Sequence, residues 1–176
     1  MTPESHVQPW ECVSFCPRCG VPSAGKANPF RCQSCDFLFF FNPAAAAAAL
    51  ILRNDGEALF IRRAKDPGKG MLAMPGGFID MDETAEDAVR REVREEVGLE
   101  IGGLEFLCSH PNPYSYRGIV YPVLDLFFVA RAPDGQAPRA LDDVAGFVWL
   151  DPRRIDSAGL AFPSMRHAIR VYQGST

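Results

Sequence analysis

The stretch GFIDMDETAEDAVRREVREEVGL, from Gly77 to Leu99, decides the fold of the chain around it. Asp82 is a candidate N-cap, acidic residues follow it, and Gly98 can end a helix in the left-handed conformation. Between these signals an apolar residue recurs at every fourth position: Ala85, Val89, Val93 and Val97. This spacing predicts an amphipathic helix that packs one stripe against a core.

Three carboxylates share the face beside this stripe. Glu92, Glu95 and Glu96 stand at spacings i, i+3 and i+4, so their like charges would destabilise an isolated helix. A hard divalent cation, which prefers oxygen ligands, would offset that repulsion. The alternative is a solvated acidic face neutralised by the interspersed arginines, and for a bare cluster of this kind it is the commoner outcome.

The complete pattern, however, resembles the signature of the Nudix hydrolases. Its specified positions are all filled, by Gly77, Glu83, Arg91, Glu92, Val93, Glu95, Glu96, Gly98 and Leu99. The resemblance implies an α/β/α sandwich with a mixed sheet. It also implies an enzyme that uses Mg²⁺ or Mn²⁺ to hydrolyse the diphosphate linkage of a nucleotide.

The resemblance assigns the metal ligands residue by residue. Glu92 and Glu96, one helical turn apart, would bind the metal, and Glu95 would share it or act as the base. A backbone carbonyl of Gly76 or Gly77 would complete the set, since no Cβ obstructs its approach to the metal. This ligand set would make the helix the catalytic element.

Further residues would support these ligands. Arg91 could hold Glu95 across one helical turn, and Glu83 could orient the preceding loop; the alternative for both is ordinary surface salt bridging. Related enzymes add a carboxylate from a downstream loop, where this chain has Asp142 and Asp143. Asp143 is our candidate for that ligand, and its alternative is a solvated charge in a turn.

Four of the six cysteines form two Cys-x-x-Cys pairs, Cys16 with Cys19 and Cys32 with Cys35, separated by twelve residues. Paired knuckles of this kind are typical of a tetrahedral structural zinc site. Disulfides would require export, and the N-terminal residues show no signal peptide. We therefore expect a zinc ribbon.

Asn42-Pro43 marks a break in the chain. We expect a flexible arm over residues 1–13, the zinc ribbon over 14–41 and a Nudix hydrolase domain over 42–176. Residues 44–53 contain six consecutive alanines but are predicted to be a strand, because Asn54-Asp55-Gly56 then supplies a hairpin turn. The other expected elements are strands at 104–109, 119–131 and 147–150, a short helix opening at Asp151-Pro152, and a helix from Pro163 to about Tyr172.

A second motif narrows the substrate. Residues 109–117, SHPNPYSYR, resemble a degenerate form of the S-Q-P-W-P-F-P-x-S stretch of the NADH pyrophosphatase branch. The matching positions are Ser109, Pro111, Pro113 and, as an aromatic ring, Tyr114. The resemblance implies an NADH-like, NAD-like or ADP-ribose-like substrate. Phe78, Tyr114 and Tyr116 are candidates to stack on its rings, and the alternative for Phe78 is core packing.

Composition sets the remaining expectations. The chain has 176 residues and a net charge of −4, which argues against broad neutralisation of nucleic-acid phosphates. No apolar run approaches the ~20 residues that span a bilayer, so the default compartment is the cytoplasm. Many relatives are homodimers, and a dimer is an expectation here. The alternative function is a non-catalytic nucleotide sensor or a nucleic-acid-binding protein that uses the ribbon.

Overall fold

The computed structural model describes residues 7–132 and 134–175, which fall into two compact units. The first unit contains the described residues up to Pro43 together with residues 113–122. The second contains residues 44–112 and the chain from Val123 onward. Within the described residues, none of the helices has both the length and the apolar character needed to cross a membrane.

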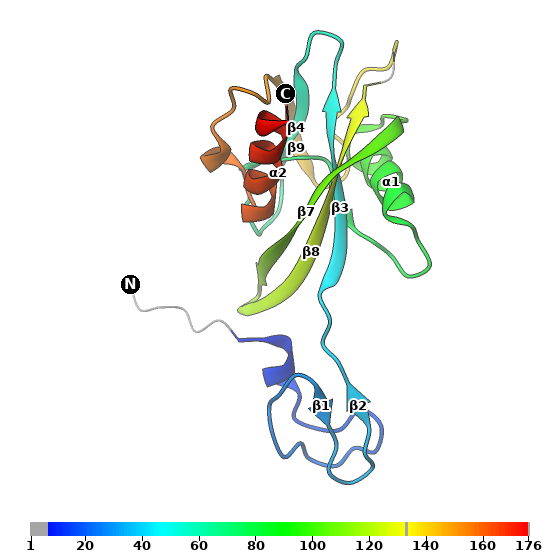
Figure 1. Ribbon diagram of the computed structural model, residues 1–176, viewed down its shortest axis with the longest axis vertical. Helices are drawn as coiled ribbons and strands as arrows, with labels where there is room; N and C mark the ends of the chain where they lie inside the picture. Colours follow the sequence, from blue (N-terminus) through cyan, green and yellow to red (C-terminus); the bar gives the residue numbers. More distant parts are fainter. Residues whose placement is uncertain (1–6, 133, 176) are drawn as a thin grey trace. The chain divides into compact units, whose positions relative to one another are not determined.

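The first unit is built around cysteines and aromatic rings. It contains the 3-10 turn η1 (Pro9–Cys12) and a two-stranded antiparallel sheet of β1 (Phe30–Arg31) and β2 (Leu38–Phe39) (Figure 1). The buried side chains are Cys16, Phe30 and Cys32. Since so small a core holds little apolar area, this unit needs a staple such as a metal ion.

The second unit is organised on a seven-stranded mixed sheet. The strand order is β5-β4-β3-β8-β7, with β6 pairing to β3 and β9 pairing to β4. The strands are β3 (Ala44–Leu52), β4 (Ala58–Arg63), β5 (Leu72–Ala73), β6 (Gly76–Phe78), β7 (Gly102–Tyr116), β8 (Ile119–Arg131) and β9 (Val144–Leu150). The β3–β8 pair is parallel, and the pairs that β3 and β4 form with their other neighbours are antiparallel.

The alanine-rich segment is a strand, as predicted. It pairs in parallel with β8, from Ala44 opposite Val123 onward, and three of its alanines also face β6. A Cβ at Gly76 would lie 2.2 Å from the carbonyl oxygen of Ala47 and 2.7 Å from the Cβ of Ala48. The close approach of β6 therefore requires small residues, and pairing on both edges overrides the helix propensity of alanine.

Two helices cover the sheet from opposite faces (Figure 1). They are α1 (Ala85–Val97), whose buried stripe includes Val89, Val93 and Val97, and α2 (Pro163–Gly174), which buries Met165 and Ile169. This arrangement confirms the expected α/β/α fold and the closing helix. It also leaves the polar face of α1 free to carry chemistry.

Two expected elements differ from the structure. Asp151-Pro152 opens no helix: the Asp151 carbonyl accepts the N–H groups of Arg154 and Ile155, and the single turn stops, so that prediction is wrong. The next element is the 3-10 turn η2 (Ser157–Gly159). The strand expected at 104–109 extends through the prolines of the second motif, which β7 tolerates because it lies at the edge of the sheet.

Candidate active site

Helix α1 begins later than the sequence suggested. Its N-cap is Thr84, whose hydroxyl accepts the Asp87 N–H at 3.1 Å. The prediction of Asp82 as the cap is wrong: Asp82 has φ +65°, whereas a capping residue takes an extended conformation. Gly98, at φ +69°, ends the helix in the left-handed conformation as expected.

Glu96 is the buried member of the acidic face, with 9% of its surface exposed. Its Oε2 accepts the backbone N–H of Gly76 at 2.9 Å, which ties the helix to β6. Burial raises the pKa of this carboxyl to about 8, against the opposing effect of the Gly76 hydrogen bond. Glu96 is thus a buried carboxyl, held by a backbone amide, and a bound cation would favour its ionised form.

Gly77 lets a second carboxylate lie against β6. A Cβ at Gly77 would lie 2.5 Å from the carboxyl carbon of Glu92. Burial raises the pKa of Glu92, while its ion pair with Arg91 opposes that shift. Glu92 and Glu96 therefore both approach the backbone of β6, and any side chain at Gly77 would displace Glu92.

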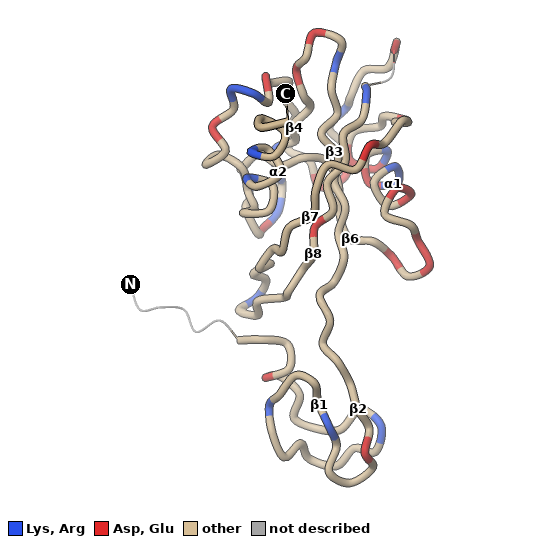
Figure 2. The backbone as a smooth tube through the Cα atoms, viewed as in Figure 1, with Lys and Arg blue, Asp and Glu red and all other residues tan. Residues whose placement is uncertain are grey.

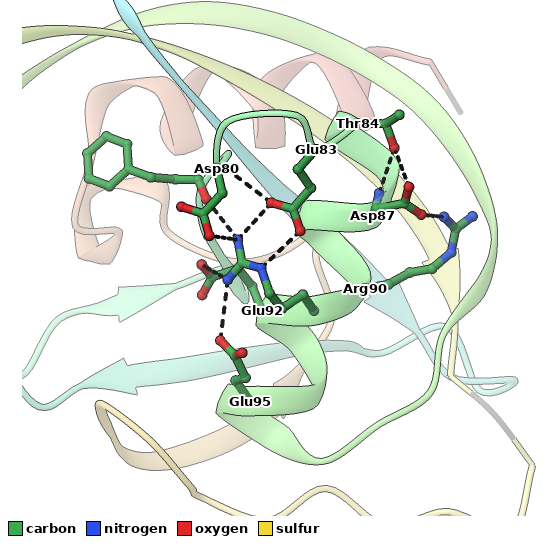
Figure 3. Close-up of polar contacts among 9 residues, drawn as sticks. Asp80, Glu83, Thr84, Asp87, Arg90, Glu92 and Glu95 are labelled. Atoms are coloured by element: carbon green, nitrogen blue, oxygen red, sulfur yellow. Dashed lines mark hydrogen bonds and ion pairs between the residues drawn. The ribbon is translucent and has the colours of Figure 1, made fainter.

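Glu83, Glu92 and Glu95, labelled in Figure 3, all accept hydrogen bonds from one guanidinium, that of Arg91. Its guanidinium donates to both carboxylate oxygens of Glu83, at 2.9 and 3.0 Å, to Glu92 at 2.8 Å and to Glu95 at 3.3 Å. It also donates to the Phe78 carbonyl at 3.1 Å. The hydrogen bonds from Arg91 lower the pKa of Glu83 and keep it ionised. One cation thus fixes three carboxylates and the end of β6.

Several acidic residues lie on α1 and on the loop before it, while others are spread along the rest of the chain (Figure 2). Glu83 closes this loop by accepting the Asp80 N–H at 3.1 Å, so its predicted orienting contact exists. The predicted contact of Arg91 with Glu95 exists as well. These geometries make no test of catalytic roles, which stay predictions.

Residues 141–143 lie against the C-terminal turn of α1. The N–H of Leu141 donates to the Glu96 carbonyl at 3.0 Å, and that of Asp142 to the Glu95 carbonyl at 3.3 Å. The charge of Asp143 contributes to the raised pKa of Glu96, so Asp143 is close enough to act on it. The same carboxylate forms an ion pair with Lys65. Asp143 thus stays a candidate ligand.

The four paired cysteines come together in the first unit. Their sulfur atoms lie within 4.8 Å of one another, with 3.8 Å between Cys16 and Cys35 and 3.7 Å between Cys19 and Cys32. Four sulfurs about 2.3 Å from a zinc ion at tetrahedral corners would be separated by about 3.8 Å. The donor set and its spacing fit zinc. In the described residues no other group of three or more His, Cys, Asp or Glu ligand atoms gathers as closely.

The three substrate candidates divide between the units. Phe78 follows the glycines of β6 with 42% of its surface exposed, so its ring is not simply core. Tyr114 and Tyr116 belong to the first unit, where the Arg117 guanidinium lies 5.3 Å from the ring centre of Tyr116. Ring stacking by these residues stays a prediction.

Sequence reasoning missed a buried polar cluster on β7, β8 and α2. Asp125 is 7% exposed and accepts a hydrogen bond from the Ser164 hydroxyl. Burial raises the pKa of Asp125. Asn112 is 4% exposed, and its Oδ1 has no hydrogen-bond partner within the described part of the chain. A single carboxylate inside the apolar run of residues 119–130 was the available signal.

The family is shown by the sequence. A family model described as NUDIX domain matches residues 42–172. The chain therefore belongs to the Nudix family. Among solved structures, a NUDIX hydrolase from Nitrosomonas europaea has a TM-score of 0.71 and 20% identity, covering 93% of this chain and 92% of that one. At that identity the likeness supports the fold alone.

Three curated relatives are similar over parts of the chain. The NAD-capped RNA hydrolase NudC of Chromobacterium violaceum is 29% identical over 88% of this chain and 56% of its own length. The human mitochondrial NAD(P)H pyrophosphatase NUDT13 is 34% identical over 57% of this chain and 28% of its own. The ADP-ribose pyrophosphatase of Methanocaldococcus jannaschii is 43% identical over 36% and 37%. The chain thus spans little more than half, or less, of these relatives.

Proposed function

We propose that this chain is a pyrophosphohydrolase that depends on a divalent metal and cleaves the diphosphate linkage of an NADH-like, NAD-like or ADP-ribose-like nucleotide. One observation carries the proposal: Glu92, Glu95 and Glu96 share one face of α1, fixed by Arg91 and by the Gly76 amide. A solvated acidic surface would need neither a buried glutamate nor a glycine strand beneath it.

The donor set fits a hard cation. Glu92, Glu95 and Glu96 offer carboxylate oxygens, Gly76 and Gly77 offer backbone carbonyls, and Asp143 is a further candidate. Mg²⁺ or Mn²⁺ bound there would neutralise phosphate charge and make a bound water more acidic. The burial of Glu96 supports this assignment, because a buried carboxyl with a raised pKa gains most from a cation partner.

The side chains around the metal would then have separate roles in hydrolysis. Arg91 would hold Glu92 and Glu95 in place, and Glu83 would hold Arg91. The side chain of Glu95 is 53% exposed, so it is the carboxylate best placed to take the proton of an attacking water. Phe78 is proposed to contact a ring of the nucleotide, whereas ring stacking by Tyr114 and Tyr116, which belong to the first unit, stays a prediction from the motif. Zinc on Cys16, Cys19, Cys32 and Cys35 would be structural.

The substrate class rests on the motif at residues 109–117 and on the relatives named for NAD(P)H, NAD-capped RNA and ADP-ribose. The test is a Mg²⁺-dependent screen of NADH, NAD, ADP-ribose, an NAD-capped RNA, diadenosine polyphosphates and nucleotide sugars. Mass spectrometry of the products in ¹⁸O-labelled water would identify the bond that breaks.

The matched variants are Glu96→Gln and Glu86→Gln. Glu86 lies exposed in the first turn of the same helix. Glu96→Gln should lower kcat by about a hundredfold or more, since it removes a ligand, and Glu86→Gln should leave kcat unchanged. Full activity of a folded Glu96→Gln protein would refute the metal site. Binding without hydrolysis by the wild type would instead favour the nucleotide sensor.

A further inference from the structure

Two cations beside the acidic face of α1 already form ion pairs with carboxylates. Arg91 forms ion pairs with Asp80, Glu83, Glu92 and Glu95, and Lys65 pairs with Asp143. A diphosphate substrate is itself an anion. A site of this kind therefore gains from a further cation that is not already paired with a carboxylate.

Arg63, at the end of β4, is such a cation. Within residues 7–132 and 134–175 no carboxylate lies within ion-pair distance of its guanidinium. Arg63 is opposite Val144 in the β4–β9 pair, and the next N–H along the chain, of Ala64, donates to the Asp143 carbonyl at 3.0 Å. Arg63 thus flanks the segment 141–144, which also contacts Glu96.

The side chain of Arg63 is held in place before any ligand binds. Its Nε donates to the Pro67 carbonyl at 2.7 Å, and its guanidinium carbon lies 4.9 Å from the ring centre of Phe162. A Cβ at Gly68 would lie 3.6 Å from the Cδ of Arg63, so the loop lies close to this side chain. These contacts use Nε and one face of the guanidinium. A fixed guanidinium loses little freedom when it binds an oxyanion.

Arg63 also acts on the acidic face at a distance. Its positive charge lowers the pKa of Glu96, in opposition to burial, which has the largest effect and raises it. The neighbouring Arg62 is exposed and donates to the Gly70 carbonyl at 2.6 Å. Two adjacent arginines thus differ in surroundings, and Arg63 is the one that acts on the pKa of the buried Glu96.

We propose that the Arg63 guanidinium binds a phosphate oxygen of the diphosphate substrate beside the carboxylates of α1. The inference rests on the proposed function and adds a phosphate-binding residue that the Nudix signature does not contain. It makes Arg63 a determinant of affinity for the charged linkage rather than for the rings.

The test measures binding of α,β-methylene ADP-ribose, in which a CH₂ group replaces the bridging oxygen, by calorimetry with Mg²⁺. The variants are Arg63→Met, Arg63→Lys and the matched control Arg62→Met. Arg63→Met should weaken binding by about tenfold or more, because a charge-assisted hydrogen bond is lost. The affinity of Arg63→Lys should lie between those of Arg63→Met and the wild type, since lysine keeps the positive charge but not the planar guanidinium. Arg62→Met should stay within about twofold of the wild type.

Each outcome decides the matter. If Arg63 only fastens the loop to Phe162, the Arg63 variants will melt at lower temperature while their folded fraction binds the analogue like the wild type, and the inference fails. Equal losses in Arg62→Met and Arg63→Met would also overturn it. A wild type that neither hydrolyses any nucleotide in the screen nor binds the analogue would instead refute the proposed function.

Discussion

Glu96 links stability to pH at the scale of one residue. Its pKa rises from an ordinary 4.5 to about 8 in the folded chain because the carboxyl is buried. Between these values the folded state holds a proton that the unfolded state has released. The stability of the metal-free protein should therefore fall as pH rises from about 4.5 to about 8.

Thermal unfolding of the metal-free protein from pH 5 to pH 8 tests this, with Glu96→Gln as the comparison. The wild type should lose melting temperature relative to Glu96→Gln across this range, since glutamine has no proton to lose. Saturating Mg²⁺ should reduce the difference, because it favours the ionised carboxylate. Parallel pH profiles of the two metal-free proteins would contradict the assignment.

Single residues also show what local patterns can and cannot predict. The contact of Arg91 with Glu95 was predictable, because residues four apart share a helix face. The position of the N-cap was not, since both Asp82 and Thr84 are good capping types. The backbone decided between them, by a turn that places Asp82 in the left-handed region.

At the scale of elements, the two glycines of β6 are needed for different reasons, Gly76 for packing and Gly77 for the position of Glu92. Gly76 has φ +147°, and a Cβ there would meet the backbone of β3, which cannot move aside. Gly76→Ala should therefore lower the free energy of unfolding by about 2–4 kcal/mol. At Gly77 the atoms nearest to a Cβ would be those of the Glu92 carboxylate, which can rotate away. Gly77→Ala should cost less than about 1 kcal/mol but lower kcat by about tenfold.

Urea unfolding and kinetics on the same two proteins separate these effects. A Gly77→Ala protein with wild-type kcat would show that Glu92 need not lie against β6. A Gly76→Ala protein as stable as the wild type would contradict the close packing of β6 on Ala47 and Ala48.

The strand β3 shows why elements are harder to predict than signatures. Six alanines favour a helix locally, and only the hairpin turn after them suggested a strand. What fixes the strand is pairing with β8 and β6, which residues distant in sequence supply. The motif of α1, by contrast, is contained in one short stretch and was predictable as a helix with a buried face.

For the whole molecule, the two units should respond differently to loss of zinc. Cys32→Ser should abolish zinc binding and unfold the first unit, because Cys16 and Cys32 are two of the three buried side chains of its core and both belong to the sulfur cluster. The second unit has its own core in the sheet and α1, and should stay folded. Elemental analysis and amide NMR spectra measure the two effects. Cys12→Ser is the control, since Cys12 is exposed and outside the cluster.

About one zinc per chain in the wild type and in Cys12→Ser, and none in Cys32→Ser, is the expected result. Absence of zinc from the purified wild type would refute the zinc ribbon.

The sequence predicted the cysteine site from its spacing, but it did not predict that residues 113–122 group with the first unit. That grouping includes a bridge between Val7 and Ile119, a contact that no local pattern encodes.

The parallel pair of β3 and β8 has a consequence for the order of assembly. During synthesis β3 emerges before α1, but β8, the strand that pairs with β3 in parallel, ends only at Arg131. Until then α1 packs on a sheet that still lacks β8. Pairing β8 with β3 closes a long loop of chain, which is slow. Nascent chains halted before residue 131 should therefore be the species most open to proteolysis and most in need of chaperones.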